Sequence, residues 1–239
     1  MIDKDKVKAF WDARAASYGE LDFNSIANLE QDPSNLALKV CLENEKVFEY
    51  MGPDLTGRHV VDLGAGVGQW AFRFIERGAA SVTAVEYSAS LARVGRLEAE
   101  RRGTENLEFV VSPAEEFRAE KTFDVVYISG LFVYMNDDQA ELFTSGLPSL
   151  CRPKTLVLLR DGTGIAGRHE INDRHSEHLN TQYSATYRTA EQYEALFAEH
   201  GFSLERHENM FAEGSPLNKY PETRLRIYRF KAPGSAEGA

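Results

Sequence analysis

Apolar residues near the start of the chain recur at the spacing of an α-helix. Residues 4–16 and 35–51 each carry apolar side chains three and four positions apart, which predicts two amphipathic helices. The stretch between them, residues 19–33, lacks this period and is expected to be a connector. We therefore expect residues 1–57 to form an N-terminal helical cap.

From His59 onward, short apolar runs alternate with helical stretches. The predicted strands are residues 59–63, 81–86, 107–111, 123–129 and 155–160. The predicted helices between them are residues 67–77, 89–102 and 137–150. This alternation is typical of parallel β–α–β units, so it predicts an α/β fold with a doubly wound, Rossmann-like sheet.

The C-terminal part follows a different pattern. A helix is expected to begin at Thr189, where Gln192 completes a capping box, and to close at Gly201. Two strand-like runs follow, residues 202–210 and 224–230, with no helix between them. They should pair antiparallel at one edge, which makes a mostly parallel sheet of seven strands.

One long polar segment fits none of these elements. Residues 161–188 are rich in histidine and arginine, and loops beyond ~12–15 residues in a compact domain are usually functional or disordered. We interpret this segment as a lid inserted into a core that spans residues 58–232. Residues 233–239 carry little to bury and are expected to form a disordered tail.

The composition restricts the class of protein. The 27 lysines and arginines against 37 aspartates and glutamates give a net charge of −10, which disfavours nucleic acid as a partner. Cys41 and Cys151 fit no disulfide or metal framework, and no stretch reaches the ~20 apolar residues that span a bilayer. We expect a cytoplasmic protein with no membrane partner, and leave open whether it is a monomer or a homodimer.

A glycine-rich turn carries the main chemical signal. Gly64, Gly66 and Gly68 follow the strand 59–63, where the absence of Cβ atoms lets a ligand approach the backbone. A dinucleotide-binding motif has its third small residue five positions after the first glycine, but Gln69 occupies that position in this chain. Here the third glycine comes after four positions, and Asp62 precedes the first by two.

This segment resembles the first motif of the class I S-adenosylmethionine-dependent methyltransferases, of the small-molecule type. The resemblance covers residues 58–160 well and includes Phe123-Asp124-Val125-Val126 at the opening of the fourth strand. It implies S-adenosyl-L-methionine as the cofactor, with Glu86 on the ribose hydroxyls. The cofactor-binding residues that it implies in the first two strand ends are Asp62, Gly64, Ala65, Gly66, Gly68, Glu86 and Tyr87.

The resemblance also implies contacts to the remaining parts of the cofactor. The family's aspartate after the third strand is absent from Ser112-Pro113-Ala114-Glu115, so adenine is expected to meet Ala114 or Glu115. Ser129 begins the loop after the fourth strand, which touches the cofactor in this family. Tyr18 either closes over the methionine end or, like Trp11, is an ordinary packing aromatic.

Candidates for the acceptor lie at the carboxyl ends of the strands and in the lid. The expected substrate residues are Phe132, Tyr134, Arg160, His169, Tyr183, Tyr187 and Arg188. His175 or His178 is the expected base if the acceptor is a hydroxyl, since histidine titrates near neutrality. The alternative is a solvated polar loop. The histidine pair alone is too weak a pattern for a metal, so we expect none.

Together these patterns predict methyl transfer to oxygen or nitrogen of a small polar metabolite, anionic ones included. One alternative is an NAD(P)-dependent oxidoreductase with a variant Rossmann turn, although no Tyr-x-x-x-Lys run is present. Others are a protein methyltransferase and a binding module without catalysis. Base-amino methylation is disfavoured because Ser129-Gly130-Leu131-Phe132 stands where such enzymes carry an Asn/Asp-Pro-Pro-Tyr run.

Overall fold

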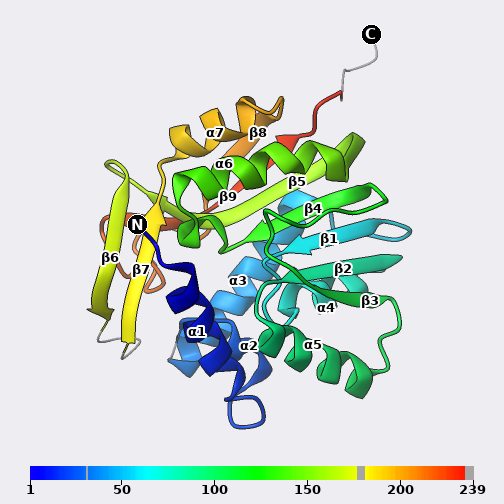
Figure 1. The fold of residues 1–239 in the computed structure, drawn as a ribbon, viewed down its shortest axis with the longest axis horizontal. Helices are drawn as coiled ribbons and strands as arrows, with labels where there is room; N and C mark the ends of the chain where they lie inside the picture. Colours follow the sequence, from blue (N-terminus) through cyan, green and yellow to red (C-terminus); the bar gives the residue numbers. More distant parts are fainter. Residues whose placement is uncertain (31, 177–180, 235–239) are drawn as a thin grey trace.

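The chain folds around one seven-stranded sheet. The computed structural model describes residues 1–30, 32–176 and 181–234, without the side chains of residues 174–176 and 181–183. The strands of the sheet are β1 (His59–Leu63), β2 (Ser81–Glu86), β3 (Leu107–Val111), β4 (Phe123–Ser129), β5 (Cys151–Gly164), β8 (Ser203–Asn209) and β9 (Thr223–Lys231). Their order is β3-β2-β1-β4-β5-β9-β8, as Figure 1 shows.

The pairing confirms the predicted fold class. The first five strands in this order pair in parallel, and β9 pairs antiparallel with both β5 and β8. Central strands are buried on both faces, and four of the five residues of β1 are buried. Such a strand appears in the sequence as a continuous apolar run, which is why its bounds were predictable.

Helices cover both faces of the sheet. They are α1 (Lys4–Ala15), α2 (Phe23–Ile26), α3 (Pro33–Met51), α4 (Gln69–Glu76), α5 (Ala89–Arg102), α6 (Asp137–Gly146) and α7 (Ala190–Ala198). One apolar core lies between the sheet and α3, α4 and α5, and a second lies between the sheet and α6 and α7. The helices α1 and α2 pack beside α5 through a third cluster that includes Ala15, Ile26 and Leu91.

Several predicted elements differ in their bounds: α7 ends at Ala198 and not at Gly201, and β5 already begins at Cys151. The helix expected over residues 137–150 ends at Gly146 and continues as the 3₁₀ helix η2 (Leu147–Leu150). Pro148 lacks the N–H that would continue the α-helical bonding, which explains the change. The capping box at Thr189 and Gln192 is present as predicted. The expected connector contains the short helix α2.

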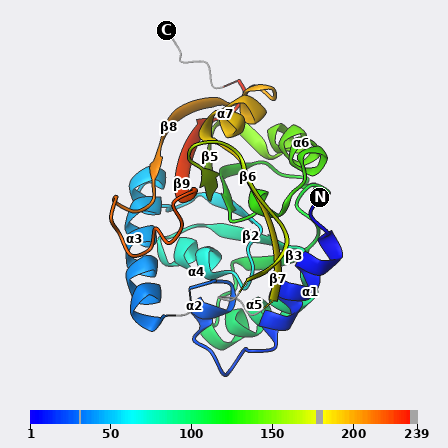
Figure 2. The same ribbon diagram turned by 90° about the vertical axis from the view of Figure 1, so that its left-hand side faces the viewer.

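The segment predicted as a loop is largely regular structure. Residues 161–164 extend β5, because β9 pairs with them up to Gly164 and Thr223. Beyond it, β6 (His169–Ser176) and β7 (Thr181–Tyr187) form an antiparallel hairpin. In Figure 2 the hairpin crosses in front of the central strands, between α1 and α3. Its polar composition hid the strand pattern, because the hairpin belongs to neither core.

Candidate active site

The glycine turn between β1 and α4 is held close to the end of β2. The backbone N–H groups of Gly64 and Ala65 both donate to the carbonyl of Val85, at 2.9 and 3.0 Å. Gly66 and Gly68 have positive φ angles of 58° and 82°, a region that other residues rarely adopt. The turn therefore exposes backbone without side chains at the carboxyl edge of the sheet, where a ligand can approach it closely.

Glu86 lies at the end of β2 and faces this turn. Its two carboxylate oxygens accept hydrogen bonds from the N–H groups of Gly66 and Ser88, each at 2.7 Å. The side chain is buried, and burial raises the pKa of this carboxyl above its ordinary value. Each oxygen retains acceptor capacity for a hydroxyl group, which agrees with the predicted ribose contact.

Asp62 is placed differently from the prediction. It lies behind the turn, 1% exposed, and does not line the cavity. Within the described part of the chain neither carboxylate oxygen accepts a well-formed hydrogen bond. Burial, followed by the neighbouring charge of Glu86, raises the pKa of Asp62 to about 8. A direct contact with the cofactor is therefore not supported by its position.

A cavity of about 1150 Å³ opens beside the turn. Of the predicted cofactor residues, those that line it are Gly64, Ala65, Gly66, Glu86, Tyr87, Ala114, Glu115 and Ser129. Gly68 does not, and a Cβ on it would come within 2.5 Å of the Phe109 ring, so this glycine serves packing. Glu115 is ion-paired to Lys4 of α1 at 2.5 Å, which links the helical cap to the expected adenine end.

The predicted role of Tyr18 is not supported. Its hydroxyl donates to the Glu98 carboxylate of α5 at 3.4 Å, and neither residue lines the cavity. Trp11, within α1, lines the cavity and meets the ring of Tyr134 edge-on at 5.8 Å between centroids. Trp11 therefore packs against neighbouring aromatic rings, as one of the two interpretations expected, and also lines the cavity.

The predicted acceptor residues divide into two groups. Those that line the cavity are Tyr134, Arg160, His169 and Tyr187. Phe132 does not, because it lies fully buried in the 3₁₀ helix η1 (Phe132–Tyr134), with its ring against Phe143 and Tyr193. Core packing, not substrate contact, explains an aromatic residue at that position.

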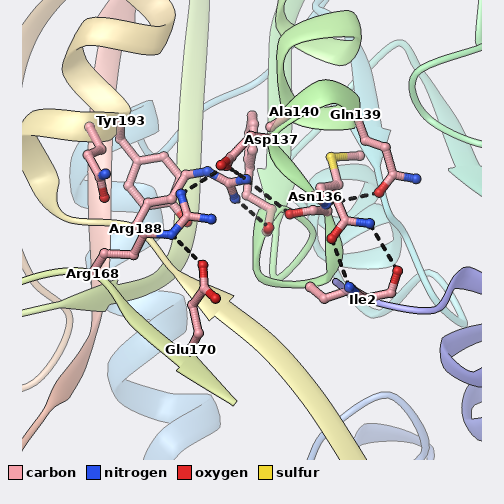
Figure 3. A network of polar contacts seen from close by, with 12 residues as sticks. Ile2, Asn136, Asp137, Gln139, Ala140, Arg168, Glu170, Arg188 and Tyr193 are labelled. Atoms are coloured by element: carbon pink, nitrogen blue, oxygen red, sulfur yellow. Dashed lines mark hydrogen bonds and ion pairs between the residues drawn. The ribbon is translucent and has the colours of Figure 1, made fainter. Parts of the chain in front are cut away.

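Arg188 is also a structural residue. Its guanidinium donates to the carbonyls of Phe132 and Met135 at 2.9 and 3.0 Å, and pairs with Asp137 at 2.6 Å. Figure 3 shows Arg168, in the loop just before β6, reaching the same carboxylate of Asp137. Asn136, beside it, exchanges two hydrogen bonds with the backbone of Ile2, as the same view shows. This network fastens the chain start and the hairpin to the loop after β4.

The side chains of three predicted residues lie outside the described part of the structure. His178 lies outside the described residues. The backbone of His175 pairs with Gln182 in the hairpin, and that of Tyr183 with Arg174, but their side chains are not described. Among the described histidines, His169 is the one that lines the cavity. No cluster of three metal-ligating side chains occurs in the described residues.

The sequence interpretation missed a group of buried charges in the cavity wall. Glu43 of α3 is 3% exposed and forms an ion pair with Arg160 of β5. Lys39, one turn earlier in α3, and Arg73 of α4 line the cavity beside them. The available signal was the spacing of Glu43, Val47 and Met51, which places an acid in register with the buried face of α3.

Asp161 lies within β5, whereas the sequence interpretation assigned it to the lid. It is fully buried, and its carboxylate accepts three backbone hydrogen bonds, from Leu131, Phe132 and Gly162, at 2.7 to 3.0 Å. Burial nevertheless raises the pKa of Asp161 to about 6. It holds the loop after β4 against the end of β5.

In the described residues, no helix has the length and apolar character needed to cross a bilayer.

The comparisons agree with the geometry of the glycine turn. The methyltransferase domain family matches residues 60–154. No curated protein matches the chain. Among solved structures, a 1,6-didemethyltoxoflavin-N1-methyltransferase from Burkholderia thailandensis is 17% identical, with a TM-score of 0.67, and the alignment covers 97% of this chain and 92% of that one. That structure holds 1,6-didemethyltoxoflavin and S-adenosylhomocysteine.

Two further structures share the fold. DhpI, solved in complex with SAH, is 19% identical with a TM-score of 0.64, and the alignment covers 95% of each chain. The [4+2]-cyclase SpnF is 16% identical with a TM-score of 0.62, and the alignment covers 80% of this chain and 79% of that one. The alternative of a nicotinamide oxidoreductase finds no support in these matches. The chain carries a methyltransferase domain in residues 60–154 and has the fold of the class I S-adenosylmethionine-dependent methyltransferases, whose cofactor is S-adenosylmethionine.

Proposed function

We propose that the protein transfers a methyl group from S-adenosylmethionine to oxygen or nitrogen of a small polar metabolite, anionic ones included. The observation that supports this most is a single cavity that joins the glycine turn and Glu86 to a polar second half. Its volume of about 1150 Å³ exceeds the roughly 300–1,000 Å³ of a site for one drug-sized ligand. Cofactor and acceptor can therefore share it.

The residues at the glycine turn fit this cofactor. Gly64 and Gly66 leave backbone accessible, and Glu86 offers acceptor oxygens for two hydroxyl groups. When bound, S-adenosylmethionine supplies an electrophilic methyl group on a positively charged sulfur. The chain has to align the acceptor with that methyl group and keep water away.

Water exclusion falls to the elements that cover the cavity. Trp11 of α1 and the Tyr134 ring form one wall, and His169 and Tyr187 of the hairpin form another. Lys6 of α1 pairs with Asp173 of the hairpin at 2.9 Å, so the two covers are joined to each other. We infer that α1 and the hairpin together form the lid over the reacting atoms.

A base is needed only where the acceptor carries a proton that it does not readily lose. His169 lines the cavity and is placed to accept such a proton at a ring nitrogen. His175 and His178 remain candidates from the same segment. If His169, His175 and His178 are each changed to alanine and turnover is unaffected by all three, alignment alone accounts for the rate.

Methyl transfer has to be measured, because a cyclase shares this fold. The test incubates the protein with methyl-labelled S-adenosylmethionine and a panel of small hydroxy acids, amines, phosphate esters and peptides. We expect label in one small-molecule class, with S-adenosylhomocysteine formed in equal amount. Label only in polypeptide would favour protein methylation, and binding of the cofactor without any transfer across the panel would contradict the proposal.

Hydrogen exchange tests the lid separately. Amides of α1 and of residues 161–188 should exchange faster in the free protein than with S-adenosylhomocysteine and acceptor together. Equal exchange in both states would show that these segments do not close over the ligands.

A further inference from the structure

Two cations pair with one carboxylate in the wall of the cavity, and a third acts on it through its charge. Arg160 forms an ion pair with Glu43, and the Lys39 ammonium lies 3.9 Å from the same carboxylate. Arg73 interacts with Glu43 through its charge alone. All four side chains line the cavity and come from three elements, α3, α4 and β5, that the fold brings together. We call them the Glu43 cluster.

The other contacts of the cluster leave its positive charge in excess. The guanidinium of Arg73 donates to the Asn24 side-chain oxygen at 3.0 Å and lies over the Trp70 ring at 4.5 Å, and neither group is an anion. In the described residues no carboxylate comes within ion-pairing distance of Arg73. Lys39 donates to the Asn28 side-chain oxygen at 2.9 Å.

Two nearby acids do not remove this excess. Glu30 is paired with Lys219 at 2.8 Å, so that pair adds no net charge. Asp161, next to Arg160, is already held by three backbone N–H groups. If Asp161 is counted as ionised, three cations still face two carboxylates.

Asp62 and Glu76 also act on Arg73 through their charge. The pKa of Asp62 is about 8, so it is protonated at neutral pH, and Glu76 is exposed and paired with Arg102. The chain as a whole carries −10, so this is a local reversal of charge.

Burial makes the excess unfavourable in the absence of an anion. Lys39 and Arg73 are largely withdrawn from water, and this desolvation lowers the pKa of both side chains. A buried positive charge is tolerated where a negatively charged partner compensates it. Lys39 and Arg73 line a cavity that is open to ligands, so a bound anion could be that partner. Arginine and lysine together are suited to a carboxylate or a phosphate group.

We propose that the Glu43 cluster is an anion subsite, in which Lys39 and Arg73 bind a carboxylate or phosphate group of the acceptor. This inference rests on the proposed function, since it assigns an acceptor class to the same cavity. The acceptor is then an anionic metabolite, held by its charge at the α3–α4 side while its nucleophilic atom faces the methyl group. The methionine carboxylate of the cofactor is the other anion that this cluster could hold, so the experiment separates the two.

The first arm measures cofactor binding by calorimetry. S-adenosylhomocysteine and its decarboxylated analogue are titrated into the wild type, Lys39→Gln, Arg73→Gln and the control Arg93→Gln. Arg93 is an exposed arginine on α5, outside the cavity. For each of the two compounds, we expect every variant to bind with the same affinity as the wild type. If Arg73→Gln weakens the binding of S-adenosylhomocysteine but not that of its decarboxylated analogue, the cluster holds the cofactor's carboxylate and the proposal is wrong.

The second arm titrates inorganic phosphate at constant ionic strength, with and without S-adenosylhomocysteine. We expect phosphate to bind the wild type and Arg93→Gln, and to bind Lys39→Gln and Arg73→Gln at least about tenfold more weakly, the loss of one charge-assisted hydrogen bond. Arg73→Lys should retain part of the affinity. Circular dichroism and the unfolding midpoint establish that each variant is folded.

The outcomes separate this inference from the proposed function. Phosphate binding that is absent in the wild type, or equal in all variants, overturns the anion subsite whatever the cofactor does. If S-adenosylhomocysteine itself fails to bind, the proposed function fails, while the phosphate titration of the free protein still reports on the cluster.

Discussion

The carboxylate of Glu86, at the end of β2, accepts a 2.7 Å hydrogen bond from the backbone N–H of Gly66, in the turn after β1. The same side chain is thus both a wall of the cavity and a brace of the glycine turn. Since a Cβ on Gly66 would lie 2.9 Å from the Cβ of Ala27, the turn is closed in from the cap side as well.

Replacing Glu86 should weaken cofactor binding, because the contact with the ribose hydroxyls is lost. Glu86→Ala should reduce affinity for S-adenosylhomocysteine by about 1–3 kcal/mol, the loss of a charge-assisted hydrogen bond. Titration of the wild type and the variant with the 2′-deoxy analogue checks the assignment, because only the wild type should discriminate against it. If the analogue carries the same penalty in both proteins, Glu86 does not bind the ribose.

Gly66→Val should abolish cofactor binding in a protein that still folds. The substitution adds a branched side chain at a positive φ and places its Cβ against Ala27, at the wall of the cavity. Gly57→Val is the matched control, because Gly57 also has a positive φ but open space around it. Both should lose some stability in urea unfolding. Normal binding of S-adenosylhomocysteine by Gly66→Val would refute the role of the turn.

Two arginines that share Asp137 should differ sharply in their effect on stability. The side chain of Arg188 is 4% exposed and also serves two backbone carbonyls, so Arg188→Met should lower the free energy of unfolding by about 3 kcal/mol or more. That of Arg168 is 27% exposed, and Arg168→Met should cost at most about 1 kcal/mol. Urea unfolding of both variants measures the difference, and equal costs would show that the carbonyl contacts contribute nothing.

The pH dependence of the free energy of unfolding should show the raised pKa of the Asp62 carboxyl. This carboxyl has a pKa of about 8 when folded and about 4 when unfolded, so unfolding between these values releases a proton. The folded state therefore loses stability as the pH rises through this window, by up to about 1.4 kcal/mol per pH unit. In Asp62→Asn this loss should be absent, so the variant gains stability relative to the wild type from about pH 5 to about pH 8.

Unfolding in urea at several pH values within that range checks the prediction for Asp62. Glu105→Gln, an exposed carboxylate in the loop before β3, is the control and should leave the slope of the wild type unchanged. If Asp62→Asn follows the wild type at every pH, the carboxyl is ionised in the folded protein.

The sequence by itself determined the sheet and the cofactor end of the cavity. The bounds of β1, β2, β3, β4 and α5 agree with the prediction. The antiparallel edge pair and the capping box at Thr189 were also predictable. These features depend on residues close together in the chain: a buried strand needs an unbroken apolar run, and a tight turn needs glycine.

Only the tertiary structure decided which side chains reach the cavity. Phe132 and Arg188 have residue types suited to substrate contact, yet one packs in the core and the other binds backbone carbonyls. The pair of Glu43 and Arg160 joins residues 117 positions apart. No local period reports such a contact, because its energy arises only when α3, α4 and β5 bury the same charges together. The glycine turn could therefore be predicted from the sequence, whereas the Glu43 cluster forms only in the folded chain.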